Sequence, residues 1–339
     1  MKVLLTGHLG YVGNILGEEL IKENYDVTGI DSGFFPQEFI ENKFPIKKSL
    51  LKDIRNVELE DVKGFDTVIH LAGLSNDPLG EINPNLTNEI NYLATIRLAE
   101  LSKKAGVQKF VFSSSCSNYG INEELVNEES ELVPQTAYAK SKVASEKDIL
   151  KLKNENFAPI ILRNATVYGV SPSQRLDLVV NNLTCSAYTT GSVKLLSDGT
   201  AWRPLLHVRD MAKAFIEMLK ADLNIVSGEI FNVGSNDENY TVKEVAKLVN
   251  KNIPDSKIEF AKGVTKDNRS YKVDFSKIKE KIGFENDWNV DKGIKEIHEV
   301  LKLKENFTEN DFNDKNFYRV KFIKTLIEND KIDSNLFYI

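Results

Sequence analysis

The stretch Thr6-Gly-His-Leu-Gly-Tyr-Val-Gly13 directly follows the apolar run Lys2–Leu5. That run is typical of a buried parallel strand, and the apolar residues of 11–22 recur at helical spacing. A strand, a glycine-rich turn and a helix therefore follow one another in the order that a dinucleotide-binding unit requires. This order predicts that the chain begins with such a unit.

Each glycine of the turn has a separate expected task. Gly7 permits the tight bend, Gly10 leaves room for a diphosphate against the backbone, and Gly13 lets the helix pack closely on the strand. The first N–H groups of the helix are free to bind phosphate oxygens. We therefore expect Leu9, Tyr11 and Val12 to contact the cofactor together with the three glycines.

The second expected strand, residues 25–30, ends at Asp31, eighteen residues after Gly13. A dinucleotide fold places a carboxylate there, on the adenosine ribose, and that carboxylate repels a 2′-phosphate. The cofactor is therefore expected to be NAD rather than NADP. In the alternative interpretation, Asp31 only begins the loop with Ser32 and Gly33. Asp53 and Ile54 are expected to meet the adenine.

The composition is that of a globular protein with a large core. The chain has 339 residues, of which 41% are hydrophobic and 28% charged, and a net charge of −6. This length allows one large core or two coupled lobes, and the negative charge argues against non-specific nucleic-acid binding. Because Met1 leads directly into the first strand and no apolar run could span a membrane, we expect no signal peptide, no membrane partner and a cytosolic location.

Cysteine and histidine are scarce. Cys116 and Cys185 are too few and too far apart for a disulfide framework or a metal site, and only four histidines are present. We expect no metal.

Further along the chain, strands and helices alternate, which predicts an α/β fold with a doubly wound parallel sheet and a smaller C-terminal α/β lobe. A strand over 66–71 runs into the small residues Leu71–Gly73, where a cofactor can lie against the backbone. A long helix is expected over 86–104, followed by a strand over 109–112 that ends in Ser113-Ser-Ser115. Ligands collect at the carboxyl ends of such strands, so these serines are expected near the chemistry.

Tyr138 and Lys142 stand four residues apart, on one face of an expected helix. The Lys142 ammonium and a positive nicotinamide would both favour phenolate, so we expect the pKa of Tyr138 to fall below its usual value of about 10. Tyr138 could then take a proton from a substrate hydroxyl while hydride leaves for the cofactor, with Ser115 bonded to the same oxygen. Alone, the spacing would indicate only a solvated helix face.

Taken together, these motifs resemble the extended short-chain dehydrogenase/reductase superfamily, in its branch of nucleotide-sugar epimerases and dehydratases. The resemblance covers roughly residues 1–300 and rests on six ordered motifs. They are Thr6-Gly-x-x-Gly-x-x-Gly13, His70-Leu-Ala-Gly73, Ser113-Ser-Ser-Cys-Ser-Asn-Tyr-Gly120, Tyr138-x-x-x-Lys142, Leu162-Arg-Asn-Ala-Thr-Val-Tyr-Gly169 and Arg203-Pro-Leu-Leu-His-Val-Arg-Asp210.

The resemblance implies an NAD-binding domain over 1–170, to which some later segments return, and a nucleotide-sugar-binding lobe over 171–300. It implies a homodimer whose interface uses the helices near 86–104 and 138–153. A nucleotide-diphosphate sugar is the expected substrate. The resemblance leaves the base open among UDP, dTDP, GDP and CDP.

Site residues follow from the matched positions. The expected catalytic residues are Ser115, Tyr138 and Lys142. The expected cofactor-binding residues are Gly7, Leu9, Gly10, Tyr11, Val12, Gly13, Asp31, Asp53, Ile54, Leu71, Ala72, Gly73, Ser113, Tyr138 and Lys142. The expected substrate-binding residues are Ser75, Ser115, Cys116, Ser117, Thr166, Asn182, Leu183, Arg203 and Arg269.

Arginines 203 and 269 match the family's diphosphate-binding positions, and a planar guanidinium suits phosphate oxygens. Arg163 and His207 are expected to organise the interface between the lobes rather than to touch substrate.

Departures from the family pattern narrow the set of reactions that the chain could catalyse. The family's 4,6-dehydratases carry an Asp-Glu pair directly after the catalytic hydroxyl residue, where this chain has Cys116 and Ser117. Neither replaces a carboxylate as acid or base at neutral pH, so dehydration is disfavoured. Thr166 replaces a frequent Asn and argues against simple equivalence with the galactose epimerase.

The favoured function is an NAD-dependent nucleotide-sugar 4-epimerase or 4-oxidoreductase. The alternatives are a 4-keto-sugar reductase, a dehydratase and, in another class, a non-catalytic NAD-binding regulator.

The C-terminal segment 301–339 extends beyond the usual family core. We expect an amphipathic helix over 317–326 and a polar linker over 306–316. The sequence leaves open whether this segment packs on the substrate lobe or lengthens a dimer contact.

Overall fold

The computed structural model describes residues 1–265, 269–304 and 306–339. Its main sheet has seven parallel strands in the order β11-β7-β5-β4-β1-β2-β3. This is the doubly wound sheet expected from the sequence. The strands are β1 (Lys2–Thr6), β2 (Asp26–Asp31), β3 (Lys48–Leu51), β4 (Thr67–His70), β5 (Lys109–Ser115), β7 (Ala158–Asn164) and β11 (Ile230–Val233).

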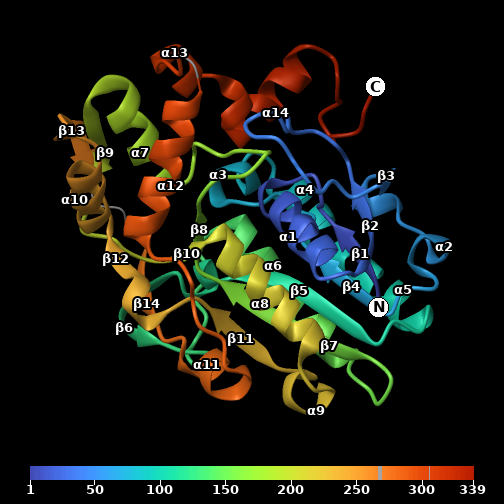
Figure 1. Cartoon of the computed structure of the whole chain (residues 1–339). Coiled ribbons are helices and arrows are strands. Elements are labelled where there is room, and N and C mark those ends of the chain that lie inside the picture. The colour runs from blue at the N-terminus through green and yellow to red at the C-terminus, as the bar shows by residue number, and fades with distance from the viewer. Residues whose placement is uncertain (266–268, 305) are drawn as a thin grey trace.

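Alternate side chains of the strands enter two apolar layers, one on each face of the sheet. Val3 and Leu5 of β1 pack with α1 (Tyr11–Lys22) and α8 (Val208–Lys220), which lie side by side over one face (Figure 1). Leu4 faces the other layer, which includes α5 (Ala94–Lys104) and α6 (Ala137–Lys151). The central strands are therefore covered on both faces, which explains why residues 3–5 of β1 are all apolar.

The helix expected over 86–104 is present but interrupted. It consists of α4 (Pro84–Asn88), a π-helical turn η2 (Glu89–Leu93) and α5. Asn91 in that turn is buried; its side chain accepts a hydrogen bond from the Leu74 N–H at 2.7 Å and donates one to the Leu74 carbonyl at 3.0 Å. The turn thus anchors the loop after β4. The strand expected over 109–112 continues through Ser115, because its three serines pair with β7.

The second lobe is built mainly from residues after β7, but α8 and β11 return to the main sheet. Its apolar centre includes Leu183 and Val245 from two of its helices. Its strands are β8 (Thr166–Tyr168), β10 (Trp202–His207) and β12 (Asn239–Thr241) in one sheet, β9 (Ser192–Ser197) with β13 (Lys257–Thr265), and β6 (Ile121–Val126) with β14 (Ser270–Val273). Its longer helices are α7 (Val179–Thr190), α10 (Val242–Asn252) and α12 (Val290–Leu303).

Short helices complete the two lobes. They are η1 (Ile54–Asn56), α2 (Leu59–Val62), α3 (Asp77–Gly80), η3 (Cys116–Tyr119), α9 (Leu223–Val226), η4 (Asn236–Glu238) and α11 (Ser276–Ile282). None of the helices in the described residues is long and apolar enough to cross a membrane.

The C-terminal segment contains α13 (Glu309–Phe312), η5 (Lys315–Phe317) and α14 (Arg319–Glu328). The helix expected over 317–326 is thus confirmed as α14, but the stretch expected to be a linker contains α13. The segment contacts both lobes: Phe317 packs on Phe39 beside the second lobe, whereas Ile323 is buried in the core of the first. In Figure 1 it runs along the edge where the two lobes meet.

Candidate active site

A cavity of about 880 Å³ lies between the carboxyl ends of the main-sheet strands and the second lobe. Ligands bind at this edge of doubly wound sheets. Nearly all of the expected site residues line it: Gly7, Gly10, Tyr11, Val12, Gly13, Asp31, Asp53, Ile54, Leu71, Ala72, Gly73, Ser75, Ser113, Ser115, Ser117, Tyr138, Lys142, Thr166, Asn182, Leu183, Arg203 and Arg269.

Two expected residues do not line the cavity. Leu9 contributes through its backbone N–H, which donates to the Asp31 carboxylate at 3.0 Å. Cys116 was expected to bind substrate, but its side chain is buried in the core, 1% exposed, and its thiol donates to the Arg163 carbonyl at 3.2 Å. Burial raises the pKa of this thiol, so Cys116 is a packing residue.

The glycine turn is as tight as expected. Gly7 has φ +76°, and a Cβ there would lie 2.8 Å from the Ala72 nitrogen. A Cβ on Gly13 would lie 2.0 Å from the Gly7 carbonyl oxygen. Gly10 caps α1 without a side chain, so the first turn of the helix faces the cavity with its N–H groups accessible to a ligand.

Asp31 lies at the end of β2, where a ribose-binding carboxylate was expected. Its two oxygens accept the N–H groups of Leu9 at 3.0 Å and Gly33 at 2.8 Å. The alternative interpretation is thus also correct in part, because Asp31 does begin the loop. Burial raises the pKa of Asp31, while these N–H donors and His8 oppose the rise.

Asp53 lines the cavity but has an intramolecular partner. Its carboxylate accepts hydrogen bonds from the Arg55 side chain at 2.9 and 2.7 Å. The Arg55 guanidinium in turn lies 3.6 Å from the ring centre of Phe337 in the C-terminal segment. The expected adenine end of the site is therefore fixed by the C-terminal segment, which the sequence did not indicate.

Tyr138 lies in the first turn of α6, which Thr136 caps by accepting the Ala139 N–H at 3.1 Å. Burial raises the pKa of Tyr138 to about 12, and the negative charge of Asp77 adds to the rise. The Ser115 hydroxyl interacts with the phenol and opposes the rise, as does the charge of Arg175. Ser115, which was expected to bind the same substrate oxygen as Tyr138, thus lies beside the phenol.

The expected lowering of the Tyr138 pKa by Lys142 is not observed in the protein alone. The Lys142 Nζ lies 5.7 Å from the Tyr138 ring centre and 4.6 Å from that of Phe112, and it donates to the Ser113 carbonyl at 2.7 Å. Burial lowers the pKa of Lys142 itself to about 8. Desolvation is therefore the main influence on the pKa of each group.

Beside the end of β5 lies a buried ion pair between Arg163 of β7 and Glu146 of α6, with an N–O distance of 2.7 Å. Glu146 also accepts hydrogen bonds from the Ser114 hydroxyl and, at 2.8 Å, from the Asn118 side chain. Arg163 further donates to the Tyr119 hydroxyl at 3.1 Å. Arg163 is structural, as expected, but it holds β5, β7 and α6 together rather than joining the lobes.

His207 has a structural role as well. Its Nε2 lies 2.9 Å from Glu296 of α12, and its ring stacks on Trp288 at a centroid distance of 4.0 Å. It does not line the cavity, and it connects β10 to the end of the second lobe.

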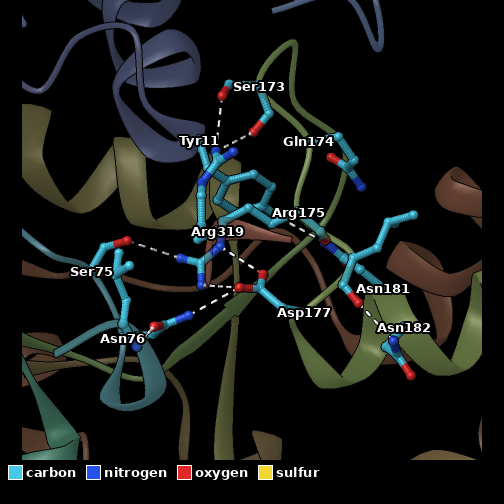
Figure 2. Close-up of polar contacts among 12 residues, drawn as sticks. Tyr11, Ser75, Asn76, Ser173, Gln174, Arg175, Asp177, Asn181, Asn182 and Arg319 are labelled. Carbon is cyan, nitrogen blue, oxygen red and sulfur yellow. Dashed lines mark hydrogen bonds and ion pairs between the residues drawn. The ribbon is translucent and has the colours of Figure 1, made fainter. Parts of the chain in front are cut away.

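Across the cavity, two loops whose conformation could not be derived from the sequence meet in a polar cluster (Figure 2). Arg175 forms an ion pair with Asp177 at 2.9 Å and donates to the Ser75 hydroxyl at 3.3 Å. The Asn76 side chain donates to Asp177 at 3.0 Å. Arg175 and Asp177 line the cavity, and neither was expected there, because which loop charges face the site depends on the loop path.

The two expected diphosphate arginines lie together. Arg203 donates to the Arg269 carbonyl, and Arg269 forms an ion pair with Asp77 at 2.8 Å. Asp77 belongs to the first domain, so this ion pair spans the cleft. Residues Asp267 and Asn268, which precede Arg269 in its motif, lie outside the described residues.

Comparison with known proteins decides the family. Residues 3–234 match the model of the NAD dependent epimerase/dehydratase family. The chain belongs to this family. Its relatives include UDP-glucose 4-epimerase of Bacillus subtilis (strain 168), 27% identical over 331 residues that cover 88% of this chain and 94% of that protein. They also include UDP-glucuronate 4-epimerase of Thermodesulfobacterium geofontis, 25% identical over 86% of this chain and 93% of that protein.

The chain is also similar to solved structures. MoeE5 in complex with UDP-glucose and NAD is 26% identical, with a TM-score of 0.75 and coverage of 89% of this chain and 99% of that one. TunA, an NAD-dependent NDP-hexosamine 5,6-dehydratase, has a TM-score of 0.79 over 90% of this chain and 98% of that one, but at 23% identity it shows the fold alone. The protein is thus an NAD-dependent epimerase/dehydratase-family enzyme with a Rossmann-type fold.

The cavity of this family enzyme fits its dinucleotide. Side chains at Gly7 and Gly13 would collide with backbone, and the first turn of α1 opens onto the space beside Asp31. Just beyond β5, the Ser117 hydroxyl is buried and has no partner among the described residues, although it lines the cavity. Such a hydroxyl is available to a bound ligand.

Proposed function

We propose that the enzyme is a UDP-sugar 4-epimerase in which Tyr138 is the acid and base. The observation that carries the proposal is that Tyr138 lines the same cavity as Ser115, the glycine turn and the second-lobe arginines. The names of the curated relatives support UDP as the nucleotide.

Four carboxylates line the cavity in the described part of the chain: Asp31, Asp53, Asp77 and Asp177. The last three each form an ion pair with an arginine, and Asp31 accepts two backbone N–H groups. An elimination of water needs a carboxylic acid or carboxylate beside the sugar that can exchange protons. The positions after Ser115 supply a buried thiol and a hydroxyl instead, which favours epimerisation over dehydration.

In the proposed reaction, the Tyr138 phenolate takes the proton of the C4 hydroxyl, and a ketone forms at C4 as the hydride departs. NAD, when bound, supplies the hydride acceptor and donor, and its positive nicotinamide favours the phenolate. Ser115 holds the same sugar oxygen through its hydroxyl. After the 4-keto sugar has turned its other face, Tyr138 returns the proton to the oxygen, so no cofactor is consumed.

Lys142 would keep its charge close to the reacting region while its Nζ donates to the Ser113 carbonyl. The pKa of about 8 means that this lysine is mostly protonated at neutral pH and close to titration. Arg203 and Arg269 would bind the nucleotide diphosphate from the second lobe, with Asn182 and Leu183 beside them.

We also propose that the chain forms a homodimer through the helices near 86–104 and 138–153. Leu93, in the π-helical turn of the first stretch, is 52% exposed. Such an apolar side chain on a helical surface suits an interface. Sedimentation of the purified protein is expected to give twice the chain mass, and a single-chain mass at micromolar concentration would contradict this assignment.

Incubation with UDP-, dTDP-, GDP- and CDP-sugars, followed by chromatography and mass spectrometry, tests the reaction. We expect a new UDP-sugar peak of unchanged mass without net reduction of NAD. Tyr138→Phe should lose at least about 100-fold in turnover, the usual size of a general acid–base contribution. Tyr25→Phe, directly before β2, is the matched control. Loss of water, net oxidation, conversion only of a keto sugar with reduced cofactor, or full activity of Tyr138→Phe would refute the proposal.

A further inference from the structure

The C-terminal segment contributes residues to the cofactor end of the cavity. The segment lies outside the part of the chain that matches the family model, which ends at residue 234. Nevertheless Tyr318, Arg319 and Ile323, from the start of α14, line the same cavity as the glycine turn. Its packing also fixes the loop after Asp31, because the Phe35 and Phe322 rings lie 5.9 Å apart.

Arg319 is the unusual member of this group. Its side chain is 2% exposed, and its Nη2 donates to the carbonyl and the hydroxyl of Ser173, each at 2.9 Å (Figure 2). The guanidinium lies 4.0 Å from the ring centre of Phe35. Its Nη1 is buried and has no hydrogen-bond partner among the described residues. A buried charged donor without a partner destabilises the folded protein. Natural proteins retain such a donor mainly where a ligand or another group accepts its hydrogen bond.

The charge of Arg319 is not cancelled by a single partner. Burial lowers its pKa to about 9, and the neighbouring Arg175 adds to the fall, while Asp177 and Asp31 oppose it. With a pKa of about 9, the guanidinium remains protonated at neutral pH. The site therefore presents a buried positive charge that an anionic ligand would compensate.

The position of Arg319 identifies the anion. Its electrostatic neighbours include Asp31, at the expected ribose end, and Tyr11, in the first turn of α1. The Ser173 loop that holds the guanidinium is tied to the same turn, because the Ser171 hydroxyl donates to the Tyr11 carbonyl at 2.7 Å. Arg319 and the first turn of α1 thus line one cavity, and a dinucleotide places its diphosphate at the N-terminus of such a helix.

We propose that Arg319 binds the diphosphate of NAD through Nη1, so that the C-terminal segment closes the cofactor site opposite the glycine turn. The proposal rests on the NAD cofactor of the family and not on which nucleotide sugar is converted. The diphosphate would then be held between helix N–H groups and a guanidinium, a charge-assisted contact. A cofactor held in this way remains bound between turnovers, which suits a reaction that returns its hydride.

The test measures the binding of four ligands, NAD, ADP, adenosine and UDP, to the cofactor-stripped full-length protein by calorimetry or ligand-observed NMR. Arg319→Gln should weaken the binding of NAD and ADP about 10-fold or more, which is the contribution of one hydrogen bond to a charged group. The binding of adenosine and UDP should be unchanged. Arg319→Lys keeps the positive charge but lacks the planar guanidinium with its paired donors. Its affinity for NAD and ADP should therefore lie between those of the wild type and Arg319→Gln. Lys324→Gln removes an exposed charge from the same helix and is the control.

The outcomes separate the possible roles of Arg319. Equal weakening of adenosine and NAD would show that Arg319 only shapes the site through Phe35, and weakening of UDP instead of NAD would assign it to the sugar nucleotide; either result overturns the proposal. So does unchanged NAD binding. Thermal melting of each variant without ligand shows whether the fold is retained. A failed sugar conversion in the wild type would refute the proposed function and leave this binding test intact.

Discussion

Replacement of Glu146 by Gln tests how the fold positions the hydroxyls proposed to act in catalysis. Glu146 and Arg163 are 4% and 3% exposed at their side chains, and their N–O distance is 2.7 Å. Burial alone would lower the pKa of Arg163, but its contacts with Glu146 outweigh this effect and raise it. Gln keeps the shape of Glu146 and removes its charge, so the variant leaves a buried guanidinium without a counter-ion.

Breaking a buried ion pair by removing one partner costs about 3 to 5 kcal/mol. For a chain of 339 residues, the entropy of unfolding is about 0.7 kcal/mol/K, so the melting temperature should fall by about 4 to 7 °C. Because Ser114 donates to Glu146 and precedes Ser115, turnover should fall as well.

Differential scanning calorimetry at neutral pH measures the change in melting temperature. The control is Glu299→Gln, which breaks the surface pair with Lys302, whose side chains are 66% and 49% exposed. This variant should melt with the wild type, because exposed pairs contribute little. If Glu146→Gln also melted within 1 °C of the wild type, the ion pair would not support the site and the reasoning would be wrong.

Three further changes have defined outcomes. Gly13→Ala should weaken NAD binding at least 10-fold in calorimetry, because its Cβ would lie 2.0 Å from the Gly7 carbonyl and force α1 away from β1. Lys142→Met should be inactive but should have a higher melting temperature than the wild type at pH 7. The difference between the two melting temperatures should narrow between pH 8 and 10.5. In the folded protein the buried Lys142 has a pKa of about 8 and loses its proton over this range, whereas the unfolded chain keeps it. The stability of the wild type therefore rises with pH. Cys116→Ala should keep turnover within 2-fold, and iodoacetamide should not label native Cys116, because the thiol is buried with a raised pKa; rapid labelling would place it in the cavity.

The features of the fold that were predicted correctly are those that depend on local geometry. Gly7 and Gly13 are required by a turn of eight residues, and the position of Asp31 follows from the length of one strand–helix–strand unit. The alternation of apolar residues in β1 and β5 determines which side chains face which helix layer. Such features involve short separations along the chain, so a sequence pattern records them.

Features that depend on distant segments were not predictable. The charge pair of Arg175 and Asp177 faces the site only because of the path of one loop, and Arg319 reaches it from a segment whose packing had two open alternatives. The pKa of Tyr138 was expected to fall because the spacing reveals a nearby lysine, but it does not reveal how deeply both groups are buried. The competition between attraction and desolvation is decided by tertiary packing.

The most direct test of the account follows deuterium at C4 of the UDP-sugar that the proposed epimerase converts. The sugar carries deuterium only at that carbon, and the product is examined by NMR and mass spectrometry. We predict that the 4-epimer retains the deuterium at C4 without exchange with water, because the hydride leaves and returns on bound NAD, and that Tyr138→Phe forms almost none of it. Deuterium lost to solvent from an epimer formed at the normal rate would contradict the account, as would an equally labelled epimer formed at full rate by Tyr138→Phe.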